Sequence, residues 1–252
     1  MSVPVGAVGS GIAEDETLDG VLGGAVRVVQ ARKGYRFSVD AVLLARFAAQ
    51  WPAPRALDLG CGCGVVGLSL LALGGADELV GVDVQEAMVD RARRSAAWNG
   101  WAHRCRFEAA DLSGDRWTPG GQVGLAVANP PYYPLGTGRV SPDPATAIAR
   151  HEGAGSVADV ARAAGRALAP GGSLCVVFPA SRVAELLEQC RRAGLEPRTA
   201  RFVHPTTAAP ASLVLLRCVR GAKEGLEVRA PLILHGKGRR YSPEAERWLG
   251  PP

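Results

Sequence analysis

The chain has 252 residues, 47% of them hydrophobic, with a formal net charge of +5. This length suits one α/β domain with short additions, or two small domains, and it is enough to bury a core. The N-terminus lacks a basic region followed by an apolar run, and no stretch has the roughly 20 apolar residues of a membrane span. We therefore expect a soluble, cytoplasmic protein without a signal peptide.

The six cysteines are Cys61, Cys63, Cys105, Cys175, Cys190 and Cys218. None forms a C-x-x-C pair, and no histidine lies at ligand spacing from another, so we expect reduced thiols and no bound metal. The mild basic charge permits a phosphate-rich partner without requiring one.

The N-terminal part of the chain predicts a loose segment, a hairpin and a helix. Residues 1–17 are Gly-rich and then acidic, which favours flexibility. Residues 24–30 alternate enough to form a strand, and pairing with the residues just before them would make a small hairpin. Ser38 stands in the N-cap position before apolar residues at helical spacing, so a helix should follow it.

From residue 55 short apolar strands alternate with helices, which is typical of a parallel, doubly wound sheet. Strands are expected at 55–59, 78–83, 104–111, 123–129 and 173–179. Helices are expected after the first two strands, at 157–168 between Ser156 and the glycines at 171 and 172, and from Ser181 to 193.

The last two strands, at 198–205 and 212–219, leave no room for a helix between them and should form an antiparallel hairpin. The sequence therefore predicts an α/β fold with a Rossmann-like sheet of seven strands, mostly parallel. Residues 221–252 form a tail, half basic loop and half short helix.

A Gly-rich turn follows the first strand of the sheet, at the edge where open α/β sheets bind ligands. Its glycines are Gly60, Gly62 and Gly64. Glycine allows a tight turn and lets a ligand approach the backbone. Gly62, Gly64 and Gly67 also fit the G-x-G-x-x-G dinucleotide pattern, which alone is weak because tight strand–helix packing explains it too.

Two acidic residues end the next two strands. Asp83 is placed to accept hydrogen bonds from both ribose hydroxyls of an adenosine ligand, and Asp111 to accept one from an adenine amine. Each alone is an ordinary loop acid. Together with the glycine turn they predict an adenosine-shaped pocket.

The fourth strand runs into Asn-Pro-Pro-Tyr, residues 129–132. A planar amine is a poor nucleophile because its lone pair is delocalised. The Asn129 side-chain oxygen and the Pro130 carbonyl could accept its two hydrogens and aim the lone pair at a methyl donor. Pro131 stiffens the turn without adding an N–H, and Tyr132 could stack on the substrate. Methyl transfer then proceeds in line, largely through proximity.

These motifs together resemble the class I S-adenosylmethionine-dependent methyltransferases. The chain is most similar to the tRNA (valine) adenine-N6 methyltransferase family, which acts at tRNA position 37, beside the anticodon. The resemblance covers most of the chain beyond residue 18, and it rests on residues 28–45, 57–68, 81–100, 129–133, 149–152, 202–205 and 211–216. It implies S-adenosyl-L-methionine as the cofactor and RNA, specifically tRNA, as the partner.

The resemblance also implies a role for each site residue. Asp58 and the glycines would line the methionine end of the cofactor, Asp83 with Val84 would hold the ribose, and Asp111 with Leu112 the adenine. Residues near the open side of the cofactor would be Tyr35, Phe37, Ser38 and Asp40. Residues 129–132 would hold the target amine.

Two further segments are possible RNA contacts. Residues 133–152 follow the catalytic strand as a lid or RNA contact, with Arg139, Arg150 and His151 as substrate-binding residues; a surface-loop role for His151 is equally plausible. The basic segment 236–241 is either a phosphate contact or a solvated tail. The expected organisation is a flexible stretch at 1–17, a hairpin and helix at 18–50, the catalytic domain at 51–220 and a tail at 221–252.

Three alternatives stay open. A protein N5-glutamine methyltransferase shares the Asn-Pro-Pro-Tyr chemistry, but it favours a helical N-terminal domain, and only about 50 residues precede the glycine turn. An NAD(P)-dependent oxidoreductase would use the G-x-G-x-x-G pattern but leaves the tetrapeptide unexplained. A non-catalytic protein that binds the cofactor and a partner is the third.

Overall fold

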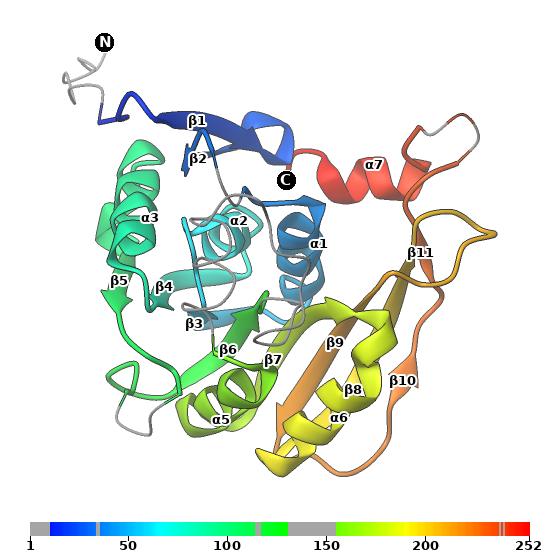
Figure 1. The fold of residues 1–252 in the computed structure, drawn as a ribbon. Helices are drawn as coiled ribbons and strands as arrows, with labels where there is room; N and C mark the ends of the chain where they lie inside the picture. The colour runs from blue at the N-terminus through cyan, green and yellow to red at the C-terminus, as the bar shows by residue number, and fades with distance from the viewer. Residues whose placement is uncertain (1–10, 34–35, 114–116, 131–154, 237, 239) are drawn as a thin grey trace.

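The computed structural model describes residues 11–33, 36–113, 117–130, 155–236, 238 and 240–252 (Figure 1). The expected N-terminal hairpin is present. Strands β1 (Glu16–Val21) and β2 (Val26–Ala31) pair antiparallel as a separate two-stranded sheet. Helix α1 (Val39–Ala48) begins after Ser38, whose side chain makes no capping hydrogen bond.

The central sheet contains the seven predicted strands. They are β3 (Ala53–Leu59), β4 (Ala76–Asp83), β5 (Cys105–Ala109), β6 (Val123–Ala128), β7 (Leu168–Pro179), β8 (Leu195–His204) and β9 (Leu213–Arg220). Strands β3 to β7 run parallel, and β9 lies antiparallel between β7 and β8. The order is β8-β9-β7-β6-β3-β4-β5, and two short strands, β10 (Glu227–Val228) and β11 (Leu232–Ile233), add parallel to β8.

Helices cover both faces of this sheet (Figure 1). They are α1, α2 (Val65–Ala72), α3 (Glu86–Trp98), α5 (Val157–Ala167), α6 (Val183–Arg192) and α7 (Pro243–Leu249). One buried cluster joins α1, α2, α3, α7 and the hairpin to one face of the sheet, and a second joins α5 and α6 to the other. Successive strand residues point to opposite faces, so Ala56 and Leu57 fall in different clusters. Burial on both sides explains why these strands are continuous apolar runs.

Most helix ends fall where the sequence predicted them. Asn99 is the C-cap of α3, and Gly100 follows in the left-handed conformation with φ 72°. Ser156 and Asp159 form a reciprocal capping box at the start of α5. This helix ends at Ala167, one residue before the expected end, and β7 begins at once. Pro170 gives the reason, because proline disfavours helical backbone at the residue before it and has no N–H to donate.

None of the described helices combines the length and the apolar character that crossing a membrane requires.

Candidate functional site

The carboxyl ends of four neighbouring strands meet at one edge of the sheet. Ala128 of β6 lies beside Leu59 of β3, and Leu59 lies beside Val82 of β4. Asp83, the last residue of β4, pairs with Ala109 of β5. From β3 the chain proceeds to β4 and β5 on one side, while β6 lies on the other, so the strand order reverses between β3 and β6. Such a reversal opens a crevice for ligands at the carboxyl edge.

The Gly-rich turn after β3 lies at this reversal. Its three glycines all have positive φ, at 72° for Gly60, 52° for Gly62 and 85° for Gly64. A Cβ atom at Gly60 or Gly62 would meet no atom within 4 Å, whereas a Cβ atom at Gly67 would lie 2.5 Å from Leu79 Cδ2. The two interpretations of the glycine pattern therefore apply to different residues. Gly67 permits close helix–strand packing, while Gly60 and Gly62 leave the backbone open to a ligand.

Asp83 ties the glycine turn to the end of β4. Its carboxylate accepts a hydrogen bond from Gly62 N at 2.9 Å and another from Gln85 N at 3.0 Å. The side chain is buried, and this burial raises the pKa of the carboxyl above its ordinary value. An ionised carboxylate has about four lone-pair positions, so the two remaining can accept from a ligand hydroxyl pair. Val84, the next residue, is 36% exposed at the same edge.

Asp58 occupies a more interior position than Asp83. It is 1% exposed, and its Oδ2 accepts a hydrogen bond from Gly67 N at 2.9 Å. Burial raises the pKa of Asp58 to about 7, and the nearby charge of Asp83 adds to this effect. The described contact thus anchors the first turn of α2 beneath the glycine turn. That Asp58 also lines the cofactor stays a prediction.

Asp111 and Leu112 follow β5 at the same edge. Asp111 is exposed, and its two oxygens accept hydrogen bonds from Ser113 N at 2.8 Å and Ser113 Oγ at 2.7 Å. These two hydrogen bonds lower the pKa of the Asp111 carboxyl, and the bond from the Ser113 hydroxyl has the larger effect. Leu112 is buried. The turn fixes Asp111 as an anion at the pocket's rim, and its role toward adenine stays a prediction.

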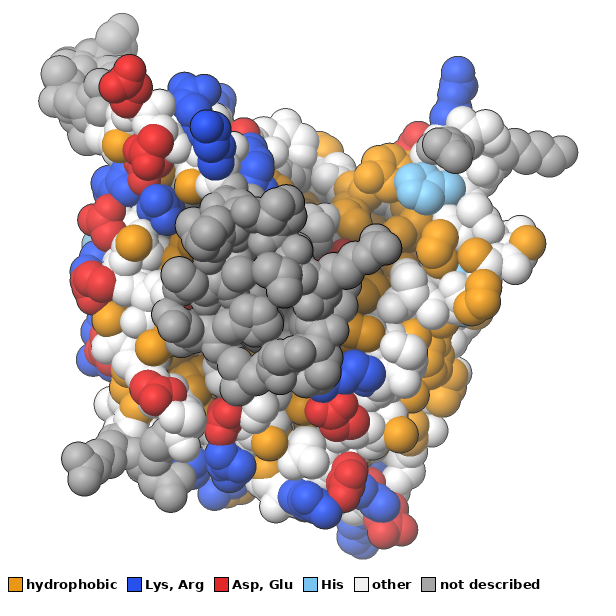
Figure 2. All heavy atoms as spheres, in the orientation of Figure 1, with side chains coloured by type: hydrophobic (Ala, Val, Ile, Leu, Met, Phe, Trp, Pro, Cys, Tyr) orange, Lys and Arg blue, Asp and Glu red, His pale blue; other side chains and the backbone are white. Residues whose placement is uncertain are grey.

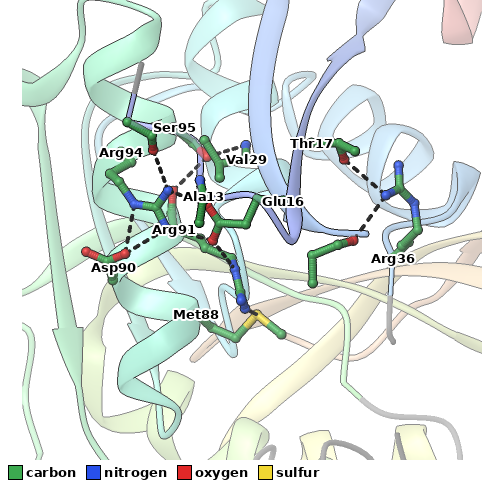
Figure 3. Close-up of polar contacts among 12 residues, drawn as sticks. Ala13, Glu16, Thr17, Val29, Arg36, Met88, Asp90, Arg91, Arg94 and Ser95 are labelled. Carbon is green, nitrogen blue, oxygen red and sulfur yellow. Dashed lines mark hydrogen bonds and ion pairs between the residues drawn. The ribbon is translucent and has the colours of Figure 1, made fainter. Parts of the chain in front are cut away.

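The segment before α1 is held to the hairpin by a polar network that the sequence analysis missed. Phe37 N donates to Gln30 Oε1 at 2.9 Å, and Gln30 Nε2 donates to Asp19 Oδ2 at 2.7 Å. Arg36 pairs with the same Asp19 oxygen at 2.7 Å and bonds Thr17 Oγ1, as Figure 3 shows for Arg36 and Thr17. The available signal was Gln30, which follows two apolar residues in a strand where burial is expected, since a buried polar group needs a hydrogen-bond partner.

This network positions three of the predicted residues. Phe37 is half-buried against the core, Ser38 is exposed, and Asp40 lies in the first turn of α1. Tyr35 lies outside the described residues.

Asn129 directly follows β6, one strand from the glycine turn, and is half-buried, while Pro130 is buried. The structure thus brings Asn129, Gly60 and Asp83 to adjacent positions along one edge. The remaining predicted site residues, Pro131, Tyr132, Arg139, Arg150 and His151, lie outside the described part of the chain. Within the described residues, no group of three or more His, Cys, Asp or Glu side chains could hold a metal ion.

The doubly wound sheet, its closing antiparallel strand and the glycine turn at the reversal of strand order are the fold of a class I S-adenosylmethionine-dependent methyltransferase. Residues 56–132 match the family model described as a methyltransferase domain. A tRNA1(Val) (adenine(37)-N6)-methyltransferase from Dickeya chrysanthemi is 31% identical over 220 residues, covering 85% of this chain and 86% of that protein. A protein of the same name from Aeromonas hydrophila is 30% identical, covering 84% and 87%. The chain belongs to the tRNA1(Val) (adenine(37)-N6)-methyltransferase family.

Solved structures agree on the fold. A predicted O-methyltransferase from Agrobacterium tumefaciens superimposes with a TM-score of 0.67 at 24% identity, covering 84% of this chain and 98% of that one. A methyltransferase from Pyrococcus furiosus gives 0.57 at 14% identity, covering 78% and 90%. The sequence expectation of a class I methyltransferase fold is thereby confirmed.

Proposed function

We propose that this chain methylates the exocyclic N6 amine of an adenine in tRNA, with position 37 of tRNA1(Val) as the first substrate to test. The observation that carries the proposal is the placement of Asn129, Gly60 and Asp83 on adjacent strand ends, in a chain of this family. The bound cofactor, S-adenosyl-L-methionine, supplies an electrophilic methyl group on a sulfonium.

The residues at the carboxyl edge fit an adenosine-bearing cofactor. Gly60 and Gly62 leave open space where a side chain would stand, which supports close approach of the ligand to the backbone. Asp83 is held in place by two backbone N–H groups and keeps lone pairs for two ribose hydroxyls. Such bonds to a charged acceptor are short and strong, which favours one fixed orientation of the ribose.

At the substrate side, Asn129 and Pro130 would orient the amine. The Asn129 carboxamide oxygen and the Pro130 carbonyl would each accept one N–H, which favours a pyramidal nitrogen with its lone pair directed at the methyl group. Pro130 has no N–H of its own, so no backbone donor competes at this position. No strong base is needed, because the nitrogen becomes acidic only once it is alkylated. Holding the two reactants in this geometry supplies most of the acceleration.

The same chemistry would methylate a glutamine side-chain amide. The identity of the substrate therefore distinguishes a tRNA adenine methyltransferase from a protein N5-glutamine methyltransferase. The similarity to proteins named tRNA adenine methyltransferases, over 84–85% of this chain, favours RNA. Because its proposed substrate is tRNA, the protein would act in the cytoplasm. Contacts by Arg139, Arg150 and His151 remain part of this proposal.

The deciding experiment supplies the protein with S-adenosylmethionine tritiated in the methyl group, together with total tRNA or total protein. We expect label in the RNA alone, recovered as N6-methyladenosine after nucleoside digestion. Label in protein hydrolysates would establish the glutamine enzyme instead. No label in either fraction, with cofactor binding intact, would contradict both.

A further inference from the structure

The C-terminal finger is the segment 235–241, of which the structure describes residues 235, 236, 238, 240 and 241. Its described ends stand at the same edge of the sheet as the proposed methyl-transfer site. Strand β11 pairs parallel to β8, with Ile233 beside His204, the last residue of β8. Strand β8 is antiparallel to β9, which is antiparallel to β7, so β8 and β11 end at the same edge as β6. From β6 to β11 there are four strand spacings, or about 19 Å at roughly 4.8 Å each. The strand register also places Ile233 four residues, or about 13 Å at roughly 3.3 Å per residue, further along the strand direction than Ala128. The base of the finger therefore stands about 23 Å from the end of β6 at the same edge.

The base of the finger is built like a β-hairpin. His235 and Tyr241 form an antiparallel bridge. Gly236 N donates to Arg240 O at 2.9 Å, and Ser242 N donates to Leu234 O at 2.8 Å. The Ser242 hydroxyl also donates to Ile233 O at 2.6 Å. These bonds fix the two arms, so the side chains of the bridge hold a defined position at the edge.

The bridge carries an aromatic platform. The rings of His235 and Tyr241 stack, with centroids 4.9 Å apart and planes 19° apart. Tyr241 is 43% exposed, one of five large hydrophobic side chains exposed in the described residues. Two others, Leu226 and Val228, lie at or near β10, and Trp98 is at the end of α3. Among these aromatic side chains Tyr241 alone lies at the carboxyl edge.

A basic side chain stands next to the platform. Arg240 is exposed and has no ion-pair partner among the described residues, a property that it shares with exposed arginines such as Arg27 and Arg247, whereas Arg191 and Arg192 pair with glutamates. Figure 2 shows a histidine side chain and a basic side chain on the surface at the upper right. A stacking ring beside an unpaired cation matches the chemistry of a nucleotide, which offers a base face and a phosphate.

We propose that this finger is a second RNA-binding point, at which an unpaired base of the substrate stacks on Tyr241 while Arg240 meets a neighbouring phosphate. Recognition of single-stranded RNA relies on such stacking, because unpaired bases expose their faces. A strand stacked at about 3.4 Å per nucleotide crosses roughly 23 Å in about seven nucleotides, so one RNA can occupy the site and the finger together. This inference rests on the proposed tRNA substrate.

The test compares Tyr241→Ala, Tyr241→Phe and Arg240→Ala with the wild type on an unmodified tRNA1(Val) transcript. For Tyr241→Ala the Kd for RNA and the KM should rise about 5- to 150-fold, the value of one lost base stack, with the loss in KM and not in kcat. Phenylalanine keeps the ring face, so Tyr241→Phe should recover most of that affinity. Arg240→Ala should lower the slope of log Kd against log salt concentration by about 1.

Two matched variants control for exposure and charge at the opposite edge of the sheet. Trp98 is 42% exposed at the end of α3, and Arg192 is exposed at the end of α6. Trp98→Ala and Arg192→Ala should leave RNA affinity and its salt slope unchanged. Calorimetry with S-adenosylhomocysteine and thermal melting confirm that every variant is folded.

The outcomes separate this inference from the function on which it rests. If the wild type methylates the tRNA and Tyr241→Ala has the same Kd and KM, the finger is not an RNA contact, although the proposed function stands. If Trp98→Ala weakens RNA binding as much as Tyr241→Ala does, the local assignment also fails. If the wild type neither binds nor methylates tRNA, both proposals are wrong.

Discussion

Asp83 joins three parts of the carboxyl edge through one carboxylate. It ends β4, accepts from Gly62 in the turn after β3, and accepts from Gln85 before α3. A buried carboxylate must have its oxygens satisfied, and the ribose of an adenosine ligand is suited to the remaining lone pairs. At the scale of single residues, Asp83 should therefore control cofactor affinity.

We expect Asp83→Ala to weaken binding of S-adenosylhomocysteine by about 10- to 100-fold, the effect of losing hydrogen bonds to a charged group. Isothermal titration calorimetry measures it, with circular dichroism to confirm folding. The control is Asp77→Ala, since Asp77 is exposed near the amino end of the same strand. Equal affinities for the wild type and Asp83→Ala, or binding of NADH in place of the methyl donor, would contradict the assignment.

Asn129 should act on the reaction and not on the cofactor. Asn129→Ala removes the acceptor that would orient the amine, and misplacing a reacting group by about 1 Å costs on the order of 100-fold. We expect kcat to fall at least about 100-fold while S-adenosylhomocysteine affinity changes less than about twofold. Gln122, exposed just before the same strand, gives the matched control Gln122→Ala. Turnover that survives in Asn129→Ala would remove this residue from the mechanism.

At the scale of elements, the hairpin is locked onto α3 by one buried acid. Glu16 is 3% exposed and contacts Arg91 Nε at 2.9 Å and Arg94 Nη1 at 2.6 Å (Figure 3). Ser95 Oγ accepts from Val29 N at 2.9 Å on the next turn. The hydrogen bond from Arg94 is the main cause that lowers the pKa of Glu16 to about 2. The hairpin that carries the segment before α1 thus depends on an ion pair across more than 70 residues of chain.

Glu16→Gln should reduce the free energy of unfolding by about 3 kcal/mol at pH 7, because the half-buried Arg91 and Arg94 lose the buried carboxylate that pairs with both of them. The folded pKa lies below the ordinary 4.5, so the stabilisation is present above about pH 4.5 and is lost as pH falls toward 2. Urea denaturation across this range should show the wild type and variant converging at low pH.

The control for this prediction is Glu86→Gln. Glu86 pairs with Arg93 at 2.9 Å, but its side chain is 67% exposed, so solvent screens the pair. We expect little change in stability. A loss as large as that of Glu16→Gln would show that burial is not the source of the effect.

At the scale of the whole molecule, the C-terminal helix α7 packs against α1, near the other end of the chain. Arg46 of α1 donates to Trp248 O at 3.0 Å and to the carbonyls of Gly250 and Pro251 at 2.6 Å each. Arg201 of β8 stacks over the Trp248 ring at 4.8 Å. The helical half of the C-terminal tail is therefore packed against α1 and β8. Because α7 begins directly after Tyr241 and Ser242, this packing also fixes the C-terminal end of the finger.

Arg46→Met keeps the aliphatic stem and removes these donors. We expect a loss of about 1–3 kcal/mol in the free energy of unfolding, since carbonyls are left without their partner. Hydrogen exchange should show faster exchange in residues 243–249, while β3 and β6 stay protected. Arg192→Met, at an exposed position on α6, is the control. Unchanged exchange in α7 would mean that Arg46 does not hold this helix.

The sequence by itself determined the order of the elements and which residues stand at the carboxyl edge. Strand and helix order follows from local apolar patterns, and Ser156, Gly100 and the glycine turn act within a few residues of their position. Parallel strands end at the same edge of a sheet, so the sequence alone predicts that Asp83 and Asn129 lie at one edge.

Only the tertiary structure decided which distant groups pair. No local pattern pairs Glu16 with Arg94, docks Trp248 beside Arg46, or separates Gly60, which faces open space, from Gly67, which packs against β4. It also brought Tyr241 to the carboxyl edge, through the pairing of β11 with β8. The physical reason is that ion pairs, docking and exposure depend on neighbours in space, and those neighbours exist only once the chain has folded.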